Sequence, residues 1–378
     1  MAARRRGSGE GSIFQRADGR WCATISIWSS GVGKRRRKTF YGKTKREVQQ
    51  KLTRAQSQKI DGKLVDGTKQ TVAEYLDRWL RDSVRTQNSG ATLVRYEGLV
   101  RNHIVPNIGG LKLANLGPAH IQGLYAAMER NGASAQTRKL AHAVIRRALN
   151  VARRLRLYVS ENPCSAVDAP KPQQPEIQPL TPEQVRHLLK ESAGSRFHAL
   201  FVLAVTTGLR QGELFALHWD DIDLEHGTIS VRHTLEELNG NLRLKEPKTA
   251  GGRRSVDLPQ MAVSALLDRR ARMMADGHTG SEWVFCNRKG RPLRKTNFSR
   301  RVWKPLRSAA GLPPIRFHDL RHTAATLLLV EGVHPKIVQE RLGHANISMT
   351  LDTYSHVLPN MQREAAGKLD SLLSDGGQ

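Results

Sequence analysis

Four short motifs in the C-terminal half of the chain carry side chains that could cut a phosphodiester bond without a metal ion. They are TTGLRQGE at 206–213, HDLRHT at 318–323, LGH at 342–344 and LDTYSH at 351–356. Such a cut needs a nucleophile, cations that neutralise charge on the non-bridging oxygens, an acid for the leaving oxygen and a base for the nucleophile's proton. Tyrosine, arginine and histidine, all present in these motifs, can fill most of these roles.

The arginines and glycines of these motifs suit contact with a phosphate. Arginine binds two oxygens at once with its planar fork and stays charged. Arg210 lies between Gly208 and Gly212, so the backbone there can bend and approach a ligand closely. His318 and Arg321 are spaced i and i+3, which would place them on one face of a helix.

Taken one at a time, these residues have structural explanations. An isolated arginine is commonly a surface charge, and an isolated tyrosine commonly packs in a core. A zinc site could be built from three of the histidines, but no cysteine or carboxylate pattern would complete a closed tetrahedral shell. These histidines are His318, His322 and His344. The order and spacing of all four motifs, and not any single residue, therefore favour phosphodiester chemistry.

Mainly helical elements must position the motifs between about residues 181 and 360. A capping box at 181–184 begins the first of these helices. Gly343 is expected to end a helix just before His344, and Tyr354 is expected on a short helix. A β insertion interrupts the helices, with a turn at Asn239-Gly240. Its strands are predicted at 228–235, 241–245 and 254–258.

Residues 66–168 predict a helical bundle. Helices are expected from the Thr71 and Glu74 capping box onward, at 92–104 with a stop near Pro106, at 118–129 and at 133–157. The last helix has an apolar stripe at positions 140, 144, 148, 151 and 155, and the cations Arg138, Lys139, Arg146, Arg147, Arg153 and Arg154 lie away from it. Such a helix can pack inward and hold phosphates outward.

Residues 1–65 form a small basic module with 17 Lys and Arg against 4 Asp and Glu, a net +13. Strands are predicted at 13–15, 21–27 and 38–41, followed by a helix from Thr44 to about Ser57. Nearby aromatic residues favour DNA contact, over a merely solvated loop, for the basic run Lys34, Arg35, Arg36, Arg37 and Lys38.

The whole chain has 61 Lys and Arg against 34 Asp and Glu, a formal +27 over 378 residues. Such self-repulsion favours a nucleic-acid partner, because each phosphate that is neutralised releases counterions. A basic ribosomal or chromatin-type protein is the alternative, although those chains are usually shorter and poorer in apolar runs. No signal peptide, spanning segment or CxxC pair is evident, so we expect a soluble, cytoplasmic protein with reduced cysteines.

We therefore expect an α+β, multidomain fold. It comprises a three-stranded sheet plus helix at 1–65, a helical bundle at 66–168, a Pro/Gln-rich linker at 169–180 and a mainly helical domain with a small antiparallel sheet at 181–360. A tail at 361–378 has a short helical pattern.

The strings TGLRQGEL, HDLRHT and LGH, with a tyrosine ten residues further on, resemble the tyrosine recombinase (phage integrase) family. The resemblance covers the chain. The first module is similar to the family's arm-site-binding domain, the helical middle resembles its core-binding domain, and the rest resembles its catalytic domain.

The resemblance implies roles for individual residues. Arg210 matches the first catalytic arginine, His318 and Arg321 the HxxR motif, His344 the second histidine and Tyr354 the nucleophile. Lys248 lies where the family carries its catalytic lysine, with Lys245 as a close competitor, and Glu213 matches an acidic residue that supports the site.

The implied reaction joins Tyr354 to a 3′-phosphate of DNA, with the phosphate held by Arg210, Arg321 and His344. Lys248 would protonate the departing 5′-oxygen and His318 would accept a proton. No metal or ATP is needed. Four protomers on double-stranded DNA would pass through a Holliday junction to integrate or excise a mobile element. A DNA-bending protein and an excisionase would be further partners, and the tail would dock on a neighbouring protomer unless it is simply frayed.

Three rival functions have different sequence requirements. A type IB topoisomerase uses similar residues, but the basic N-terminal module and short tail favour an integrase. A non-catalytic DNA-binding protein would not need every catalytic position intact. A metal-dependent nuclease needs clustered carboxylates, and the densest acidic cluster, Asp220, Asp221 and Asp223, is interpreted as a turn.

Overall fold

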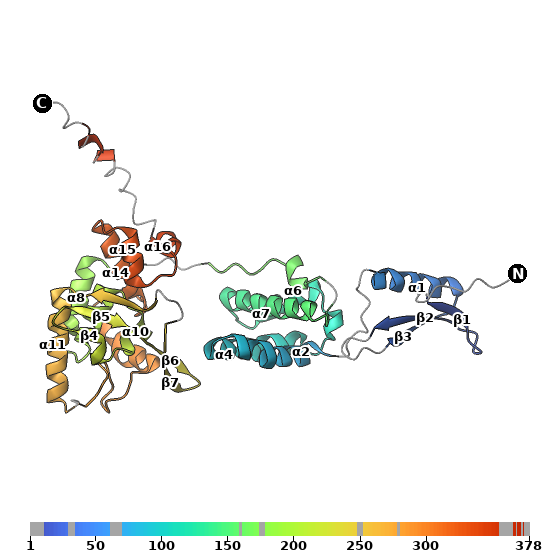
Figure 1. The fold of residues 1–378 in the computed structure, drawn as a ribbon, viewed down its shortest axis with the longest axis horizontal. Helices are drawn as coiled ribbons and strands as arrows, with labels where there is room; N and C mark the ends of the chain where they lie inside the picture. The colour runs from blue at the N-terminus through green and yellow to red at the C-terminus, as the bar shows by residue number, and fades with distance from the viewer. Residues whose placement is uncertain are drawn as a thin grey trace. The chain divides into compact units, whose positions relative to one another are not determined.

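The structure is a computed structural model that describes residues 11–28, 35–60, 70–158, 161–173, 178–247, 252–277, 280–354, 366–367, 369–371 and 373 (Figure 1). The chain divides into two compact units, Met1–Gln174 and Pro175–Gln378. Each unit has its own hydrophobic clusters. The predicted α+β fold class is confirmed.

The N-terminal part of the first unit is a three-stranded antiparallel sheet, in the order β1-β2-β3, covered by one helix (Figure 1). Its elements are β1 (Ser12–Gln15), β2 (Trp21–Trp28), β3 (Arg35–Gly42) and α1 (Lys45–Ile60). Gly19, with φ +76°, makes the β1–β2 turn, and Ile25 of β2 is buried with Val48 and Leu52 of α1. The third strand begins earlier than predicted, because the basic run pairs with the end of β2 through its backbone.

The rest of the first unit is helical. The helices are α2 (Val72–Trp79), α3 (Arg85–Gln87), α4 (Gly90–Leu99), α5 (Val105–Ile108), α6 (Pro118–Arg130) and α7 (Ala135–Arg154). Two π-helical turns, η1 (Leu80–Val84) and η2 (Val100–Ile104), and two 3-10 turns, η3 (Leu113–Asn115) and η4 (Pro163–Ala166), join or follow them. The Thr71–Glu74 capping box is present, and the buried Tyr75 hydroxyl donates to the carbonyl oxygen of Ala148 at 2.6 Å.

Two details of this bundle differ from the sequence prediction. The second predicted helix runs past Ile104 and through Pro106 to Ile108, because the wider turn η2 precedes the proline and Val105 donates back to Val100. Leu155 is not part of the buried stripe of α7: it is 60% exposed, since α7 ends at Arg154. Val144 and Ala148 of the predicted stripe are buried, together with Ile145 and Leu149.

The second unit is built around α9 (His198–Thr207), a helix that is apolar on nearly every side and therefore central. The other helices are α8 (Pro182–Ser192), α10 (Gln211–Phe215), α11 (Gln260–Ala275), α12 (Lys295–Phe298), α13 (Lys304–Ala309), α14 (Asp319–Val330), α15 (Pro335–Leu342) and α16 (Ile347–Tyr354), with short turns η5 (Trp219–Asp221) and η7 (Ser299–Trp303). Leu180, at the end of the predicted linker, is buried in this core, and its N–H donates to Thr323.

The strands of the second unit form two separate sheets. One has the order β4-β5-β8, from β4 (Ile222–Asp223), β5 (Thr228–Val231) and β8 (Arg254–Asp257); the other is the hairpin of β6 (Thr234–Leu238) and β7 (Asn241–Lys245). The single strand predicted at 228–235 is therefore wrong. After Val231 the chain leaves the first sheet, and β6 pairs with β7 and packs on α10, where Gly212 allows close approach.

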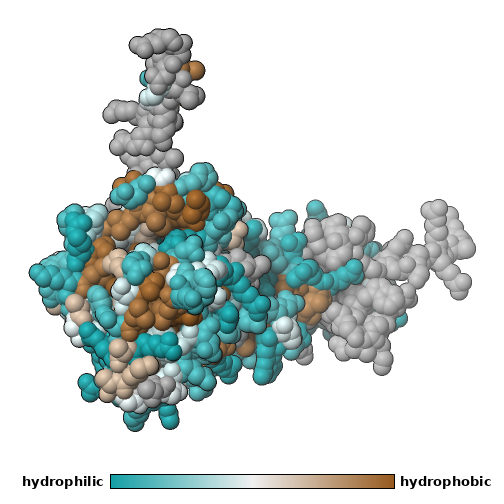
Figure 2. Space-filling view, turned by 60° about the vertical axis from the view of Figure 1, so that its left-hand side comes forward, coloured by the Kyte–Doolittle hydropathy of each residue, from teal (hydrophilic) through white to brown (hydrophobic). Residues whose placement is uncertain are grey.

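The surface of the second unit carries some exposed apolar side chains. Figure 2 shows apolar patches among hydrophilic side chains on one face of the molecule. Four large apolar side chains of α11, α14 and α15 are at least half exposed: Leu267, Met274, Val330 and Ile337. Among the described residues, no helix is both long and apolar enough to cross a membrane.

Candidate active site

Arg210 lies in the turn between α9 and α10. Gly208 ends α9 with φ +64°, and a Cβ at this position would lie 2.5 Å from Cδ2 of Leu342. Arg210 is extended and caps α10, where its N–H donates to Glu213 at 2.9 Å. Its guanidinium donates to Glu213 Oε1 at 2.8 Å and to the carbonyl oxygen of Gly343 at 3.1 Å. The side chain is 39% exposed, so it is open to a ligand.

Glu213 is a buried carboxylate shared by two arginines. Its side chain is 3% exposed and lies within 2.9 Å of both Arg210 and Arg254. Burial raises the pKa of Glu213, but the hydrogen bonds and charges of Arg254 and Arg210 outweigh this, so the pKa lies below its usual range. The ionised carboxylate therefore fixes the direction of the Arg210 guanidinium.

Arg321, on α14, joins the two glycine turns of the site. Its guanidinium donates at 2.8 Å to the carbonyl oxygen of Gly208 and at 2.8 Å to that of Leu342. Arg210 donates to the next carbonyl, that of Gly343, which has φ +66° and ends α15. The two arginines, 111 positions apart in sequence, therefore converge on one turn. Arg321 is 4% exposed and lies deeper than Arg210.

His318 immediately precedes α14, three residues before Arg321. Burial is the main cause that lowers the pKa of His318 to about 4, and the neighbouring His322 and Arg321 lower it further. The rings of His318 and His322 meet edge to face, with centroids 5.5 Å apart. At neutral pH His318 is uncharged, so it is able to accept a proton.

His344 follows the glycine turn and is linked to the next helix. Its Nδ1 lies 2.9 Å from Oγ1 of Thr350 on α16, and its carbonyl oxygen accepts from Gln339. Burial, followed by the charges of Arg321 and Arg210, lowers the pKa of His344 to about 4. A neutral imidazole is thus held beside the two arginines.

The proposed nucleophile and the two candidate lysines differ in how much of each the structure describes. Tyr354 is the last residue of α16, as the sequence predicts, but its side chain lies outside the part of the structure that is described, and so does Lys248. Lys245 ends β7, lies 3.8 Å from Glu236 and lines a cavity of about 450 Å³ together with Arg210. The choice between the two lysines therefore stays open.

Comparison with known proteins identifies the family. A model of the phage integrase family matches residues 178–361, and a model of the phage integrase N-terminal SAM-like domain matches residues 71–128. A tyrosine recombinase XerC-like protein of Caldanaerobacter subterraneus subsp. tengcongensis is 32% identical, over 92% of this chain and 95% of that protein. The chain belongs to the phage integrase family of tyrosine recombinases. It is a site-specific DNA recombinase of the integrase type, and the resemblance inferred from the motifs is confirmed.

Other proteins are similar to this tyrosine recombinase in sequence or in fold over most of its length. An integrase of Streptomyces ambofaciens is 28% identical over 99% of both chains. The fold is similar to that of the Tn1549 transposon integrase, solved in complex with a circular intermediate DNA, with a TM-score of 0.70, 24% identity and coverage of 79% of this chain and 99% of that one. It is also similar to the lambda integrase tetramer bound to a Holliday junction, with a TM-score of 0.57, 19% identity and coverage of 93% and 96%.

The cations predicted to bind DNA differ in their freedom to do so. Lys139 and Arg146 of α7 are exposed, whereas Arg138 pairs with Glu129 at 2.8 Å and Arg147 donates to Asn88 at 3.1 Å. In the basic run, Arg37 is exposed and Lys38 is half-buried. Lys34 and the side chains of Arg35 and Arg36 lie outside the described part.

Sequence reasoning missed a basic cavity in this recombinase. It measures about 680 Å³, and no acidic residue lines it among those described. Its cations are Arg196, Arg288, Lys289, Arg294 and Arg301. The run NRKGRPLRK at 287–295 was the available signal. Arg254 and Thr350 were missed as well, because neither belongs to a sequence motif that would indicate which residue it contacts.

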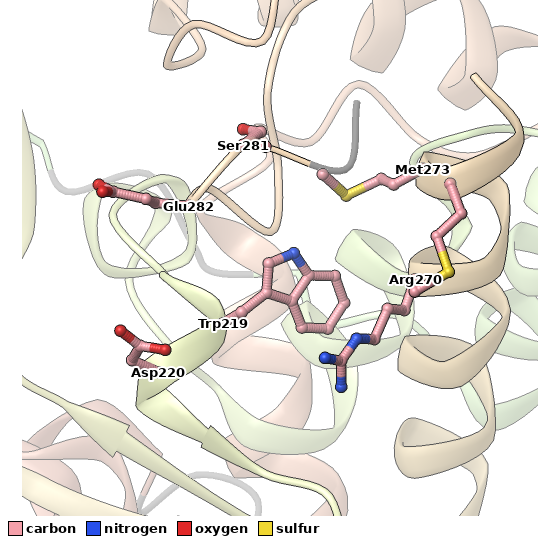
Figure 3. Close-up of a pocket in the computed structure, with 8 residues that line it drawn as sticks. Trp219, Asp220, Arg270, Met273, Ser281 and Glu282 are labelled. Atoms are coloured by element: carbon pink, nitrogen blue, oxygen red, sulfur yellow. The ribbon is translucent and has the colours of Figure 1, made fainter. Parts of the chain in front are cut away.

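A smaller cavity of about 270 Å³ lies elsewhere in the second unit and contains none of the motif residues (Figure 3). The Arg270 guanidinium lies 5.6 Å from the centroid of the Trp219 ring, and Asp220 and Glu282 lie across the indole from it. No group of three or more His, Cys, Asp or Glu side chains that could hold a metal ion occurs among the described residues.

Proposed function

We propose that this recombinase integrates or excises a mobile element by cutting DNA with Tyr354, which becomes joined to a 3′-phosphate. One observation carries the proposal: Arg210 and Arg321 both donate to the Leu342–Gly343 turn. The next residue, His344, is hydrogen-bonded to Thr350. Thr350 lies four positions before Tyr354, one turn earlier on the same helix.

The two arginines act as the phosphate clamp in this proposal. A guanidinium neutralises the charge that develops on non-bridging oxygens as the phosphorus gains its fifth ligand. Arg210 is exposed enough to contact the phosphate directly, whereas Arg321 is buried and acts from the protein side of the site. His344 donates a hydrogen bond to the phosphate. Backbone carbonyls and Glu213 support this role, because they hold both guanidinium groups before DNA arrives.

Cleavage moves two protons, one from Tyr354 and one to the leaving 5′-oxygen. The Tyr354 oxygen forms a bond to phosphorus, the bond from phosphorus to the 5′-oxygen breaks, and the leaving oxygen takes a proton from Lys248. The tyrosine proton passes to His318, which is neutral at pH 7 because of its burial. Lys245 is the alternative acid, supported by its place in the cavity that Arg210 lines.

Resealing reverses these steps with a new strand. A 5′-hydroxyl of a partner strand attacks the phosphorus of the phosphotyrosine and gives its proton to the lysine. The bond from phosphorus to the Tyr354 oxygen breaks, and that oxygen takes back the proton held by His318. The phosphotyrosine keeps the energy of the original bond, so the proposal requires neither ATP nor a metal ion. The positive charges that a metal would supply come from arginine side chains instead.

The parts of the chain divide the DNA contacts among themselves. We assign arm-type sites to residues 1–65, core sites to 66–168, a connecting role to 169–180 and cleavage to 181–360. The charge of the first module, the exposed cations of α7 and the basic cavity support this division. Each cation that meets a phosphate adds to affinity and to its dependence on salt.

Recombination needs more than one protomer in this proposal. Four copies on two duplexes exchange strands in pairs through a Holliday junction, and residues 361–378 dock on a neighbouring copy. Exposed apolar side chains on α14 and α15, Val330 and Ile337, support such contacts. A DNA-bending protein and an excisionase would set direction, and the complex would act at the nucleoid in the cytoplasm of a bacterial host.

The test is strand exchange between two DNA sites. Duplexes that cover both flanks of the coding sequence are paired and incubated with the full chain, and joint products are sequenced. We expect one precise junction from wild type and none from Tyr354→Phe, with DNA binding kept. Nicking and relaxation without exchange of partners would favour a topoisomerase-like reaction, and binding by both proteins with no product would favour a non-catalytic role.

A further inference from the structure

An arginine outside every motif, with its side chain almost entirely buried, makes contact with several segments of the active site. Arg254 is the first residue of β8, and its side chain is 7% exposed. Its Nη2 donates to Glu213 Oε2 at 2.9 Å, and its Nη1 approaches Glu213 Oε1 at 3.4 Å. Arginine and carboxylate planes that meet in this two-point way resist rotation.

The remaining hydrogen bonds of Arg254 reach the backbone of two other segments. Its Nε donates to the carbonyl oxygen of Arg341 at 2.8 Å, one residue before the Leu342–Gly343 turn. Its Nη1 donates to the carbonyl oxygen of Gly252 at 3.2 Å, at the end of the segment that joins β7 to β8 and carries Lys248. One guanidinium therefore connects the carboxylate beside Arg210, the end of α15 and the backbone of Gly252.

The side chain of Arg341 makes the reverse connection. It donates to the carbonyl oxygens of Asp257 at 2.8 Å and Thr206 at 3.1 Å. The end of α15 is thus attached to both ends of β8, through Arg254 at its start and Asp257 at its finish. The same residue also attaches α15 to the end of α9, two positions before Gly208. Packing alone would leave these loops able to slide, whereas directed hydrogen bonds fix their register.

The charges of this group favour a phosphate ligand. Glu213 alone would neutralise Arg210, leaving the pair with no net charge. Because Arg254 shares the carboxylate, the group of three keeps a net positive charge. Arg254 is also among the cations that lower the pKa of His344, so its field reaches the catalytic turn. Its burial keeps it from touching DNA.

We propose that Arg254 is a positioning residue for strand cleavage, which holds Glu213, the end of α15 and the start of β8 so that Arg210 and His344 meet the phosphate in one geometry. This role rests on the proposed function, because it acts through the clamp assigned there.

The test compares Arg254→Lys with Arg253→Lys in the full chain. Arg253 is the adjacent residue, 62% exposed and paired with Glu246, so the same change is made without the buried contacts. A nicked duplex that releases a short 5′-hydroxyl fragment traps the covalent product in a single turnover. We expect Arg254→Lys to lower the rate constant on the order of 100-fold, since small misplacements of reacting groups cost that much, with DNA affinity unchanged. Arg253→Lys should match wild type.

Two readouts separate positioning from folding. A folding defect lowers the fraction of protein that reacts, whereas a positioning defect lowers the rate constant of the folded fraction. On a duplex whose scissile phosphate carries a neutral methyl group in place of one charged oxygen, the clamp has less charge to neutralise. The Arg254→Lys defect should therefore shrink by about tenfold or more on that duplex.

Several outcomes would overturn the inference. An Arg254→Lys rate constant equal to wild type would do so, as would a defect of equal size on both duplexes. If Arg254→Lys and Arg254→Gln both lose DNA binding and thermal stability together with cleavage, Arg254 holds the fold and not the site. If wild type itself forms no adduct, the proposed function fails, and the positioning role fails with it.

Discussion

Nδ1 of His344 lies 2.9 Å from Oγ1 of Thr350, a fully buried threonine on the helix that ends with Tyr354. This hydrogen bond connects the turn contacted by both arginines to the helix that carries the proposed nucleophile. It also fixes which ring nitrogen of His344 faces away from the helix, because one nitrogen is already engaged. The hydrogen bond therefore helps to hold this turn and the start of the last turn of α16 in a fixed relation.

Thr350→Val should slow cleavage without weakening DNA binding. The valine keeps the shape of threonine but leaves His344 Nδ1 without its partner, at a cost of about 1–3 kcal/mol. In rate this is roughly 10- to 100-fold. The measurement is single-turnover formation of the covalent adduct, with Thr350→Ser, which keeps the hydroxyl, as the control. Equal rates for the valine and serine variants would show that the contact does not matter.

Gly208→Ala should destabilise the second unit and disturb Arg210. The backbone has φ +64°, which disfavours a side chain, and the new Cβ would lie 2.5 Å from Leu342. We expect the free energy of unfolding to fall by about 1–3 kcal/mol. Gly194→Ala is a matched control, because open space surrounds its Cβ position and its φ is not positive. Chemical denaturation of both variants checks the prediction, and similar losses at both sites would contradict it.

The two site histidines set a pH window for stability. Burial first, then nearby positive charge, lowers the pKa of His318 and of His344 from 6.5 to about 4. Between pH 6.5 and about 4 the unfolded chain therefore binds more protons than the folded chain. The contribution of these two histidines to the free energy of unfolding is therefore fully present above pH 6.5 and is lost as pH falls toward 4. Thermal melting of wild type across this range should show the loss, and His318→Asn should reduce it.

A matched control for this window is His187→Asn, which replaces an exposed histidine of α8. This variant should keep the pH dependence of wild type. Cleavage should be level between about pH 8 and about pH 5 and fall below that as His318 becomes charged and can no longer accept a proton. A rate that falls with an apparent pKa near 6.5 would mean that His318 is not buried as the structure shows.

The general acid can be assigned by changing the leaving group. Lys248→Met should lower the cleavage rate by about 100-fold or more, the usual contribution of a general acid. A duplex with sulfur in place of the 5′-bridging oxygen needs no proton to leave, so it should restore the rate of that variant. Lys245→Met is the paired variant, because Lys245 lies beside Arg210 in the cavity. If Lys245→Met loses the cleavage rate and regains it on the sulfur duplex, and Lys248→Met does not, then Lys245 is the general acid.

Much of the fold could be predicted because local signals agree with tertiary packing. The Thr71 capping box, the Asn239-Gly240 turn and the left-handed Gly343 each mark an element boundary that the structure has. The strand at 228–235 could not be divided correctly, because its last two residues belong to another sheet through pairing with β7. The helix past Pro106 depends on a π turn, which apolar spacing does not reveal.

The site shows the same limit. Motif residues such as Arg210, Arg321 and His344 could be found from sequence because their types and order suit phosphate chemistry. The structure adds what connects them: a glycine turn that accepts from both arginines and a threonine that holds the histidine. Thr350 and Arg254 carry no signal of their own, since an isolated threonine or arginine is usually explained by solvent or packing.

The most direct test of DNA cleavage by Tyr354 traps and maps the covalent intermediate. Nicked duplexes from both flanks of the coding sequence are incubated with the full chain and a chelator, the mixture is denatured and digested, and the peptide bearing DNA is sequenced by mass spectrometry. We expect a metal-independent adduct on Tyr354, absent from Tyr354→Phe. An adduct on another residue, or tight binding at a proven site with no adduct, would contradict it.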